Sequence, residues 1–444
     1  MTPQYLLISL RKNTIVLNFP FFIAKRVAAS GQKSFARLII RIAIAAVALS
    51  IAIMIIATSL IKGFKSEISG KMFGFWGHIH ITSVQQTTTF EPIPISSNQP
   101  FLPKLKDVES VPLLEPNFLE RLKKSTHTEG GVHHVQVYAT KAGIIKTKDN
   151  FEGIVLKGVG QDFDWLFVEQ NLVEGRKINF CGIDSCHDIL ISQSTANRLN
   201  LKTGSKFIVH FVQNNAQEQR LFEVCGIYKT GLEEYDKKFA LVDIAHIQQL
   251  LGWSENQIAG FEVFVDDIKD LKSINEHIYN ELITNDLTSQ TIRQEEPAIF
   301  DWLDLQDVNE QVILILMLVV SIINMVTALL ILILERTNMI GTLKSLGTTN
   351  WRIQQMFLFY GAIIISIGLV IGNLIGLGLG WLEQRFKFIH LSEVDYYLSY
   401  APIQFDFWTI LILNIGTLII TTVFLLLPTF MVLSISPVKA IRFK

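Results

Sequence analysis

The chain alternates between long uncharged blocks and a polar middle region. Four blocks hold no Asp, Glu, Lys or Arg over the length that a membrane-crossing helix needs. An α-helix rises about 1.5 Å per residue, so about 20 residues span the roughly 30 Å of hydrocarbon in a bilayer. Four apolar helices of this length are not typical of a soluble domain. The pattern therefore predicts transmembrane helices at residues 42–61, 312–334, 353–382 and 407–436.

Lysine and arginine residues beside these blocks predict the orientation of the chain. The segment before the first span contains no acidic residue, and the first one in the sequence is Glu67. Cytoplasmic flanks of membrane spans are enriched in cations. We therefore expect segments 1–41, 335–352 and 437–444 to be cytoplasmic, together with both termini. The supporting cations are Lys25, Arg26, Lys33, Arg37, Arg41, Arg336, Lys344, Arg352, Lys439, Arg442 and Lys444.

The same orientation places segments 62–311 and 383–406 outside the cytoplasm. Short alternating runs broken by Gly, Asn and Asp make segment 62–311 typical of a large α+β domain, inserted between the first and second spans. The stretch 82–116 is rich in Pro, Ser, Thr and Asn and is expected to be irregular. We expect strands at 78–82, 132–147 with a turn near Lys141, 188–191, 206–212, 220–228 and 261–265, and helices at 193–199, 240–251 and 269–282.

Histidine and cysteine residues of this domain raise two candidate sites. His78 and His80 lie two residues apart and would project from one face of a strand, where His133 or His134 could join them around a metal. No carboxylate or cysteine falls at ligand spacing, so we expect no metal. The second candidate site is a pair of cysteines. Cys181 and Cys186 bracket a turn and either form a disulfide in an oxidising compartment or stay two unpaired surface thiols. The third cysteine, Cys225, is expected to be buried.

Several functions are excluded by what the sequence lacks. There is no phosphate-binding loop of the Gly-x-x-x-x-Gly-Lys-Ser/Thr type, so we expect no ATP or magnesium on this chain and no ATP hydrolysis by it. The spans contain Asn324, Asn373 and Asn414 but no ionisable residue in their interiors, which argues against an ion-coupled carrier. A net charge of −1 gives no reason to expect a nucleic-acid partner. Energy for transport must then come from another protein.

The predicted cytoplasmic loop contains a short amphipathic segment that ends at Gly347. At helical spacing one side is apolar, with Met339, Ile340, Leu343 and Leu346, and the other is polar, with Asn338, Thr342 and Ser345. Such a helix either lies in the lipid headgroups or docks into a groove of a cytoplasmic partner. Spacing alone does not choose between the two.

Glycines recur every four residues in the third span. Gly368, Gly372, Gly376 and Gly380 would stack along one helix face, and Gly378 would widen that face. Small residues at this spacing let a neighbouring helix backbone approach closely. We therefore predict a helix-packing face, with a kinked or mobile helix as the alternative.

The loop resembles the coupling segment of the FtsX-like permeases, a group that includes the lipoprotein-releasing permeases LolC and LolE and the efflux permease MacB. Further similar segments are Phe22-Ile23-Ala24-Lys25-Arg26, Gly63-Phe64, Leu156-Lys157-Gly158-Val159, Ile189-Leu190-Ile191-Ser192, Phe222 to Tyr228 and Pro437 to Arg442. The resemblance covers nearly the whole chain, and the segments outside the membrane are similar to the LolC and LolE branch. It implies that the ATPase-coupling helix contains Glu335, Arg336, Met339, Ile340, Leu343, Lys344, Leu346 and Gly347.

The resemblance also implies a fold and a set of partners. The expected fold is four transmembrane helices with a MacB-like periplasmic domain, in a permease of the cell inner membrane. The expected partners are a cytoplasmic ABC ATPase, a second permease in a homo- or heterodimer, membrane lipids, lipoproteins and a periplasmic carrier. The family's carrier-capturing arm matches the short turn 211–219, which disfavours a LolC-type role. The alternatives are an FtsX-type relay that controls cell-wall hydrolases and a split MacB-type efflux permease.

Overall fold

The chain forms two compact units in the computed structural model. The helical unit contains the described residues up to Gly63, Leu305–Lys387 and those from Pro402 onward. The α+β unit contains the described residues of Phe64–Asp304 together with Phe388–Ala401. The structure describes residues 35–86, 92–114, 126–146, 151–180, 186–213 and 216–435. Most of the predicted N-terminal segment, the predicted tail 437–444 and Cys181 thus lie outside the described residues.

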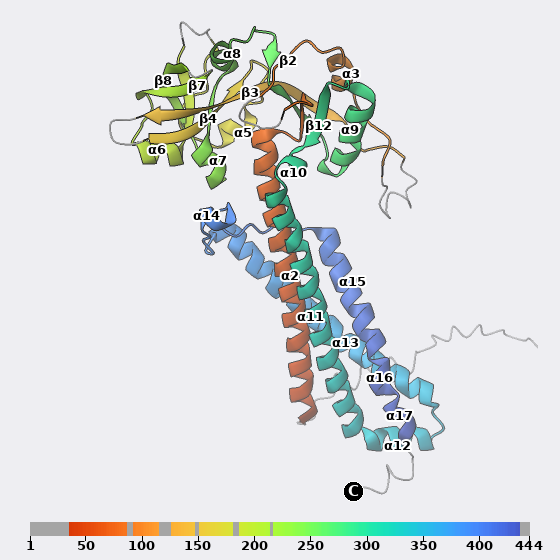
Figure 1. Cartoon of the computed structure of the whole chain (residues 1–444). Helices are drawn as coiled ribbons and strands as arrows, with labels where there is room; N and C mark the ends of the chain where they lie inside the picture. The colour runs from red at the N-terminus through yellow and green to blue at the C-terminus, as the bar shows by residue number, and fades with distance from the viewer. Residues whose placement is uncertain are drawn as a thin grey trace, which may run out of the picture. The chain divides into compact units, whose positions relative to one another are not determined.

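The described residues contain four helices that are long and apolar enough to cross a membrane. All four predicted spans coincide with them, although the first two helices are much longer than the predicted spans. The reason is that both helices continue as polar, amphipathic turns, and on α2 the continuing residues Ile68 and Met72 are buried in the core of the α+β unit. The helices are α2 (Phe35–Trp76), α11 (Pro297–Glu335), α13 (Asn350–Phe386) and α15 (Phe407–Phe424) (Figure 1).

The fourth span is broken near its end. Helix α15 stops at Phe424 and is followed by the short helices α16 (Leu426–Thr429) and α17 (Met431–Ser434). Pro428 lies inside this stretch, and a proline has no backbone N–H to continue the helical ladder. The single predicted helix 407–436 is therefore three shorter helices in sequence.

A ten-stranded sheet forms the centre of the α+β unit in the described residues. Its order is β12-β1-β11-β3-β4-β9-β6-β8-β5, and β7 pairs with both β3 and β8. Pairings therefore run in a ring through β3, β4, β9, β6, β8 and β7. The strands are β1 (Ile79–Ser83), β3 (Val132–Lys146), β4 (Phe151–Val159), β5 (Leu172–Gly175), β6 (Asp188–Ser192), β7 (Lys206–Gln213), β8 (Ala216–Tyr228), β9 (Phe239–Asp243), β11 (Gly260–Val265) and β12 (Leu287–Thr291).

Short helices cover the sheet at both ends. Helices α3 and α9 lie towards the β12 end (Figure 1), whereas α6 packs against β6 and β8. Strand β2 (Ile95–Ser96) lies in the stretch 82–116 that was expected to be irregular. It forms a separate two-stranded pair with β10 (Gln257–Ile258). The short helices of the α+β unit are α3 (Leu102–Lys106), α5 (Leu166–Gln170), α6 (Gln193–Leu199), α7 (Glu233–Lys238), α8 (Ile244–Leu251), the 3₁₀ turn Ile268–Asp270, α9 (Leu271–His277), the π-helical turn Ile278–Leu282, α10 (Ile292–Glu295) and α14 (Glu393–Tyr396). The short helix α12 (Thr337–Ser345) belongs to the helical unit.

Two predicted elements of this domain are wrong. The predicted turn near Lys141 does not form, because β3 continues through it and pairs Lys141 with Leu156 and Gly143 with Ile154. Residues 240–243, predicted as helix, belong to strand β9, which is enclosed between β4 and β6. A short apolar run bounded on both sides is equally compatible with a buried strand. The helix begins only after Asp243, whose carboxylate accepts a hydrogen bond from the backbone N–H of Ala245.

Candidate functional site

Helix α12 packs onto the helical unit through its apolar side. Ile340 is fully buried in the core of that unit, and Met339 and Leu343 pack against the same core. The sequence left open whether the apolar side of this helix contacts lipid or a groove of a partner protein. In the structure most of that side packs against the helical unit of the chain itself.

Lys344 fixes the last turn of α12. Its ammonium donates hydrogen bonds to the carbonyl oxygens of Val432, at 2.6 Å, and Ile435, at 2.8 Å. Both acceptors lie at the end of the fourth span, where α12, α16 and α17 lie together (Figure 1). Carbonyl groups at a helix C-terminus lack partners within the helix, and a cation there is stabilised by the helix dipole. The Lys344 ammonium therefore binds α12 to the end of the fourth span within the helical unit.

The outer side of α12 is polar, with one large apolar residue beyond its end. Asn338, Thr342 and Ser345 are exposed, and Leu346 has an exposed fraction of 77%. Leu346 was expected on the apolar side with Met339. Instead its side chain is exposed at the C-terminal end of the helix, where Leu346 is the C-cap residue. The outer surface of α12 is what another protein could contact.

Two other predicted coupling residues flank the helix. Glu335 is the last residue of α11, and Arg336 is the N-cap of α12. They form the corner between the second span and α12, so their position is set by the backbone of that corner. The assignment of all these residues to an ATPase remains a prediction.

The glycine row of α13 faces another span. A Cβ atom built on Gly372 would lie 1.7 Å from Ile51 and 2.6 Å from the carbonyl oxygen of Ala48. Gly368 and Gly376 face the same helix, α2, through Val47 and Ala52. Close approach of the two backbones thus leaves no room for a side chain at Gly368 or Gly372 and little room at Gly376. The residues of α2 and α13 that make this contact all belong to the helical unit.

The last glycines of the row behave differently. A Cβ on Gly380 would meet Phe405, which precedes α15, at 2.5 Å. Gly378 has no atom within 4 Å of its Cβ position, so the expectation that it widens the packing face is wrong. Gly378 lies two residues from both Gly376 and Gly380, which on a helix places it on another side.

A pair of asparagines joins the third and fourth spans. Asn373 donates to the side-chain oxygen of Asn414 at 2.6 Å, and Asn414 donates back at 3.0 Å. Asn324 does not take part, since its amide bonds to the carbonyl of Val320 in its own helix. Reciprocal amide bonds satisfy both side chains, which matters where no water is available.

The segment Phe388–Ala401 between the third and fourth spans docks on the α+β unit. Leu398 is buried in the core of that unit, and the ring of Tyr397 contacts Trp302. The ammonium of Lys71 donates to the carbonyl oxygen of Tyr397 at 3.1 Å. The predicted short loop 383–406 therefore contributes a folded part to the large domain. We call Phe388–Ala401 the strap.

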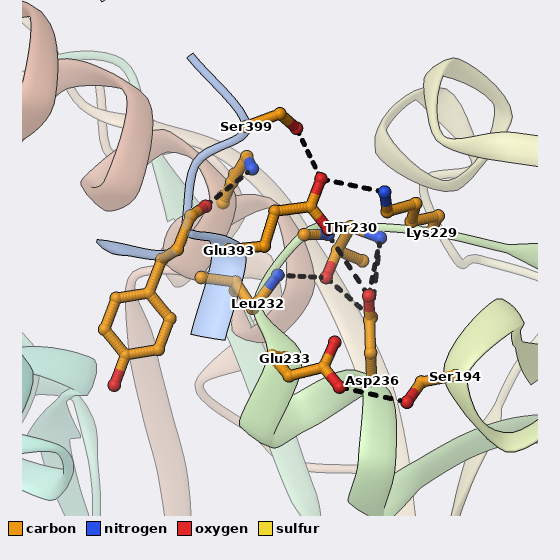
Figure 2. A network of polar contacts seen from close by, with 11 residues as sticks. Ser194, Lys229, Thr230, Leu232, Glu233, Asp236, Glu393 and Ser399 are labelled. Carbon is orange, nitrogen blue, oxygen red and sulfur yellow. Dashed lines mark hydrogen bonds and ion pairs between the residues drawn. The ribbon is translucent and has the colours of Figure 1, made fainter. Parts of the chain in front are cut away.

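An ion pair holds the strap at its short helix α14. Glu393 lies 2.8 Å from the ammonium of Lys229 and also accepts a hydrogen bond from Ser399 (Figure 2). Burial by itself raises the pKa of Glu393, but the hydrogen bonds from Lys229 and Ser399 outweigh burial and lower that pKa. The Glu393 side chain is therefore a carboxylate that pairs with the Lys229 ammonium.

The loop that carries Lys229 is itself held by a buried carboxylate. Asp236 accepts hydrogen bonds from the backbone N–H of Thr230 and of Gly231, at 3.2 Å and 3.1 Å, and from the Thr230 hydroxyl at 2.7 Å (Figure 2). Gly231 has a φ of +77°, a conformation that glycine adopts without strain. Asp236 thus holds the backbone of the loop that presents Lys229 to the strap.

The histidines suggested as metal ligands have separate partners. His78 stacks on Phe73, with ring centroids 4.6 Å apart, and its Nδ1 accepts from the N–H of Val265. Burial first, and the nearby His133, lower the pKa of His78 to about 4. His80 is buried and bonded to Glu295 and to the Trp76 carbonyl. In the described part of the chain no three His, Cys, Asp or Glu residues are grouped as a metal site.

The cysteines fall into two classes. Cys186 is disulfide-bonded, whereas Cys225 is a buried free thiol. Burial and the neighbouring Asp188 raise the pKa of Cys225 to about 12, so the thiol stays protonated. Cys181 lies outside the described residues, and its pairing with Cys186 remains a prediction.

Two groups of polar residues were missed by sequence reasoning. One is the strap contact of Glu393 and Lys229, which joins residues far apart in the chain. The other is the buried ion pair of Lys157 and Glu262. A signal for the second existed, since each is a lone charge within an apolar strand of the sequence, and lone buried charges are generally paired.

Comparison with known proteins finds one matching family domain and relatives that are similar over most of the chain. Residues 311–437 match the family described as the FtsX-like permease C-terminal domain. LolC of Neisseria meningitidis, a lipoprotein-releasing system transmembrane protein, is 21% identical over 94% of this chain and 97% of its own. LolE of Haemophilus influenzae is 21% identical over 96% of this chain and 99% of its own.

Two solved structures are also similar to part of the chain. The extracellular domain of the ABC-type transporter YknZ matches 48% of this chain and 98% of its own, at 16% identity and a TM-score of 0.30. The periplasmic region of MacB from Actinobacillus actinomycetemcomitans matches 50% of this chain and 91% of its own, at 16% identity and a TM-score of 0.28. Residues 311–437 thus match an FtsX-like permease C-terminal domain, and the chain is similar along nearly its whole length to LolC and LolE.

Proposed function

We propose that the chain is a lipoprotein-releasing permease subunit that transmits the work of a separate ABC ATPase to its α+β unit. In this proposal the α+β unit lies outside the cytoplasm, while α12 and both termini lie inside. ATP and magnesium bind to the partner ATPase and not to this chain. A second permease subunit, identical or different, completes the transporter.

The observation that carries the proposal is the way α12 is mounted. A short helix between two spans would transmit a push only if it were fixed to the bundle. Ile340 and Lys344 supply that attachment, and the exposed side with Thr342 and Leu346 is left for the motor protein. The glycine contact of α13 with α2 and the strap then offer routes within each unit along which movement can be passed.

The energy of lipoprotein release explains the need for ATP. Two sixteen-carbon acyl chains, at about 0.8 kcal/mol for each buried CH₂, hold a lipoprotein in the bilayer by roughly 25 kcal/mol. Release without a motor would be negligible at that value. The chain itself offers no phosphate-binding loop, which supports a separate ATPase.

Depletion of the protein tests the substrate. We expect outer-membrane lipoproteins to accumulate in the inner membrane, measured by membrane fractionation and immunoblotting. Normal lipoprotein sorting after depletion would contradict this substrate. In that case, binding of a cell-wall hydrolase or its activator to the full-length protein would support the FtsX-type relay instead.

Substitutions on the outer side of α12 test the motor contact separately. Thr342→Asp with Leu346→Asp should abolish co-purification of the ATPase while leaving the protein inserted, because both side chains point away from the bundle. Leu166→Asp is the matched control, since Leu166 is also exposed and lies in the α+β unit. Unchanged co-purification in the α12 variant would mean that the outer side of this helix does not contact the ATPase.

A further inference from the structure

The C-terminal end of α2 is closed by two buried cationic side chains. The ammonium of Lys157, on β4, donates to the carbonyl oxygen of Phe75, and Nε2 of His80, on β1, lies 2.7 Å from the carbonyl oxygen of Trp76. These carbonyls belong to the last turn of the 42-residue helix. The final carbonyls of a helix lack intrahelical donors, and cations are favoured beside them.

Two carboxylates balance these cations inside the α+β unit. Glu262, on β11, lies 2.7 Å from the Lys157 ammonium, and both side chains are fully buried. Glu295, on α10, lies 2.7 Å from Nδ1 of His80. Buried ions are tolerated when they are paired and hydrogen-bonded. Since α10 directly precedes α11, the cluster ties the end of the first long helix to the start of the second.

The hydrogen-bond geometry fixes the protons of His80. A backbone carbonyl can only accept, so Nε2 must carry a hydrogen towards Trp76. Nδ1 then faces the Glu295 carboxylate across 2.7 Å, and that bond needs a second proton on the imidazole ring. Loss of this proton would place a lone pair of Nδ1 against a carboxylate. The contact would then be repulsive.

We propose that the proton shared by His80 and Glu295 is a pH-sensitive latch, which ties the last turn of α2 to α10 when bound and releases it when lost. The groups facing His80 from the elements packed around it are Glu295 of α10, Glu262 of β11, Tyr138 of β3, Gln290 of β12 and the Trp76 carbonyl of α2. Lys157 of β4 pairs with Glu262. None of these supplies a second donor to Nδ1.

The electrostatics of the cluster agree with this geometry. Burial by itself lowers the pKa of His80, but the charge and hydrogen bond of Glu295, with Glu262, outweigh burial and raise that pKa. A histidine whose folded-state pKa is raised stabilises the fold fully below its unfolded value of about 6.5. The stabilisation is lost as the pH rises through the raised folded-state pKa. The latch is therefore closed at acidic pH and opens on the alkaline side.

Hydrogen exchange on the full-length protein in lipid nanodiscs tests the latch. Exchange rates of peptides covering residues 70–80 and 292–296 would be measured from about pH 6 to about pH 9 and corrected for intrinsic rates. We expect protection of both peptides to fall with rising pH, by about tenfold for each unit by which the folded-state pKa exceeds the unfolded one. Peptides of β6, which pairs with β8 and β9 and not with the strands that carry the cluster, should keep their protection.

Glu295→Gln gives the sharpest result. A glutamine amide donates to the lone pair of neutral His80, so the bond forms without the extra proton. We expect this variant to stay protected at alkaline pH, with the step abolished. His80→Gln should lack the step but show weak protection at every pH. The matched control is Glu255→Gln, an exposed carboxylate whose removal should leave the step unchanged.

Two outcomes would overturn the proposal. One is a wild-type protein whose two peptides show no pH-dependent step. The other is a Glu295→Gln variant whose step equals that of the wild type, because the titrating group would then be a different one. Lys157, whose pKa burial lowers, is the neighbouring candidate in that case. Neither outcome bears on the substrate proposed above, so the two proposals fail independently.

Discussion

Single atoms decide which glycines of the third span matter. Gly372 has Ile51 and the Ala48 carbonyl where a side chain would begin, whereas Gly378, in the same helix, has open space. Both are glycines in one apolar helix, so helix propensity treats them alike. Only the neighbouring helix distinguishes them.

The pair Gly372→Ala and Gly378→Ala makes this difference measurable. We expect Gly372→Ala to destabilise the helical unit by about 1–3 kcal/mol, the usual range for overpacking. Gly378→Ala should be neutral or stabilising by up to about 1 kcal/mol, since alanine favours a helix. Thermal unfolding of the two purified variants in the same detergent measures both effects. Equal destabilisation by the two changes would show that the row packs against no helix.

The residue patterns in the sequence predicted some of these positions and not others. The spacing of four predicted the face of Gly368, Gly372 and Gly376, because a helix fixes that geometry. It could not separate Gly378 from the row, since openness depends on a second helix. The lone charges of Lys157 and Glu262 were visible in the sequence, but their contact was not predicted, because β4 itself was not predicted and pairing across strands is a tertiary property.

Among the elements, the strap is the least expected. It is short, it separates two spans, and its core residue Leu398 is buried with residues of the large domain. Its ion pair is partly exposed, with Lys229 and Glu393 at 41% and 24%. Pairs of this kind contribute about 0.2–1 kcal/mol. The apolar contact of Leu398 should therefore contribute more than the ion pair.

Charge reversal tests the strap contact. Glu393→Lys should increase hydrogen exchange across residues 388–401, because two ammonium groups would then face each other. The double variant Lys229→Glu with Glu393→Lys should restore most of the protection, as the pair is re-formed in the opposite sense. If the single change leaves exchange as it was, the strap is held by Leu398 and the tyrosine contacts alone.

Element boundaries followed local chemistry where that chemistry was decisive. Helix α6 begins and ends where the sequence predicted, because Ser192 caps it and Asn200 adopts a left-handed conformation at its end. Residues 240–243 were misassigned, since an apolar run next to a helix carries no signal that two strands will enclose it. Pro428 is a signal in the sequence for a helix break. The prediction nevertheless treated residues 407–436 as one helix, because the whole block is apolar.

For the whole molecule, the orientation in the membrane decides the proposed mechanism. The helical unit and the α+β unit contain residues that the proposal assigns to opposite compartments. Leu346, beside α12, is assigned to the cytoplasm, and Leu166, on α5, to the other side. Both side chains are exposed, at 77% and 60%, so both positions can be labelled.

Cysteine labelling checks this assignment directly. In intact spheroplasts a membrane-impermeant maleimide should label Leu166→Cys and leave Leu346→Cys unlabelled until the membrane is permeabilised. The parent chain serves as the blank, since Cys186 is disulfide-bonded and Cys225 is buried. Labelling of both variants in intact spheroplasts would remove the compartment difference on which force transmission depends.

The bond from Lys344 to the Ile435 carbonyl has a practical consequence for work on the transporter. It brings Ile435, the last described residue, next to α12. A purification tag fused after Lys444 would be tethered to Ile435 by nine residues, which reach at most roughly 30 Å, and we expect it to compete with the motor protein. A tag inserted in an exposed loop of the α+β unit avoids that interference, so the two placements should yield complexes of different composition.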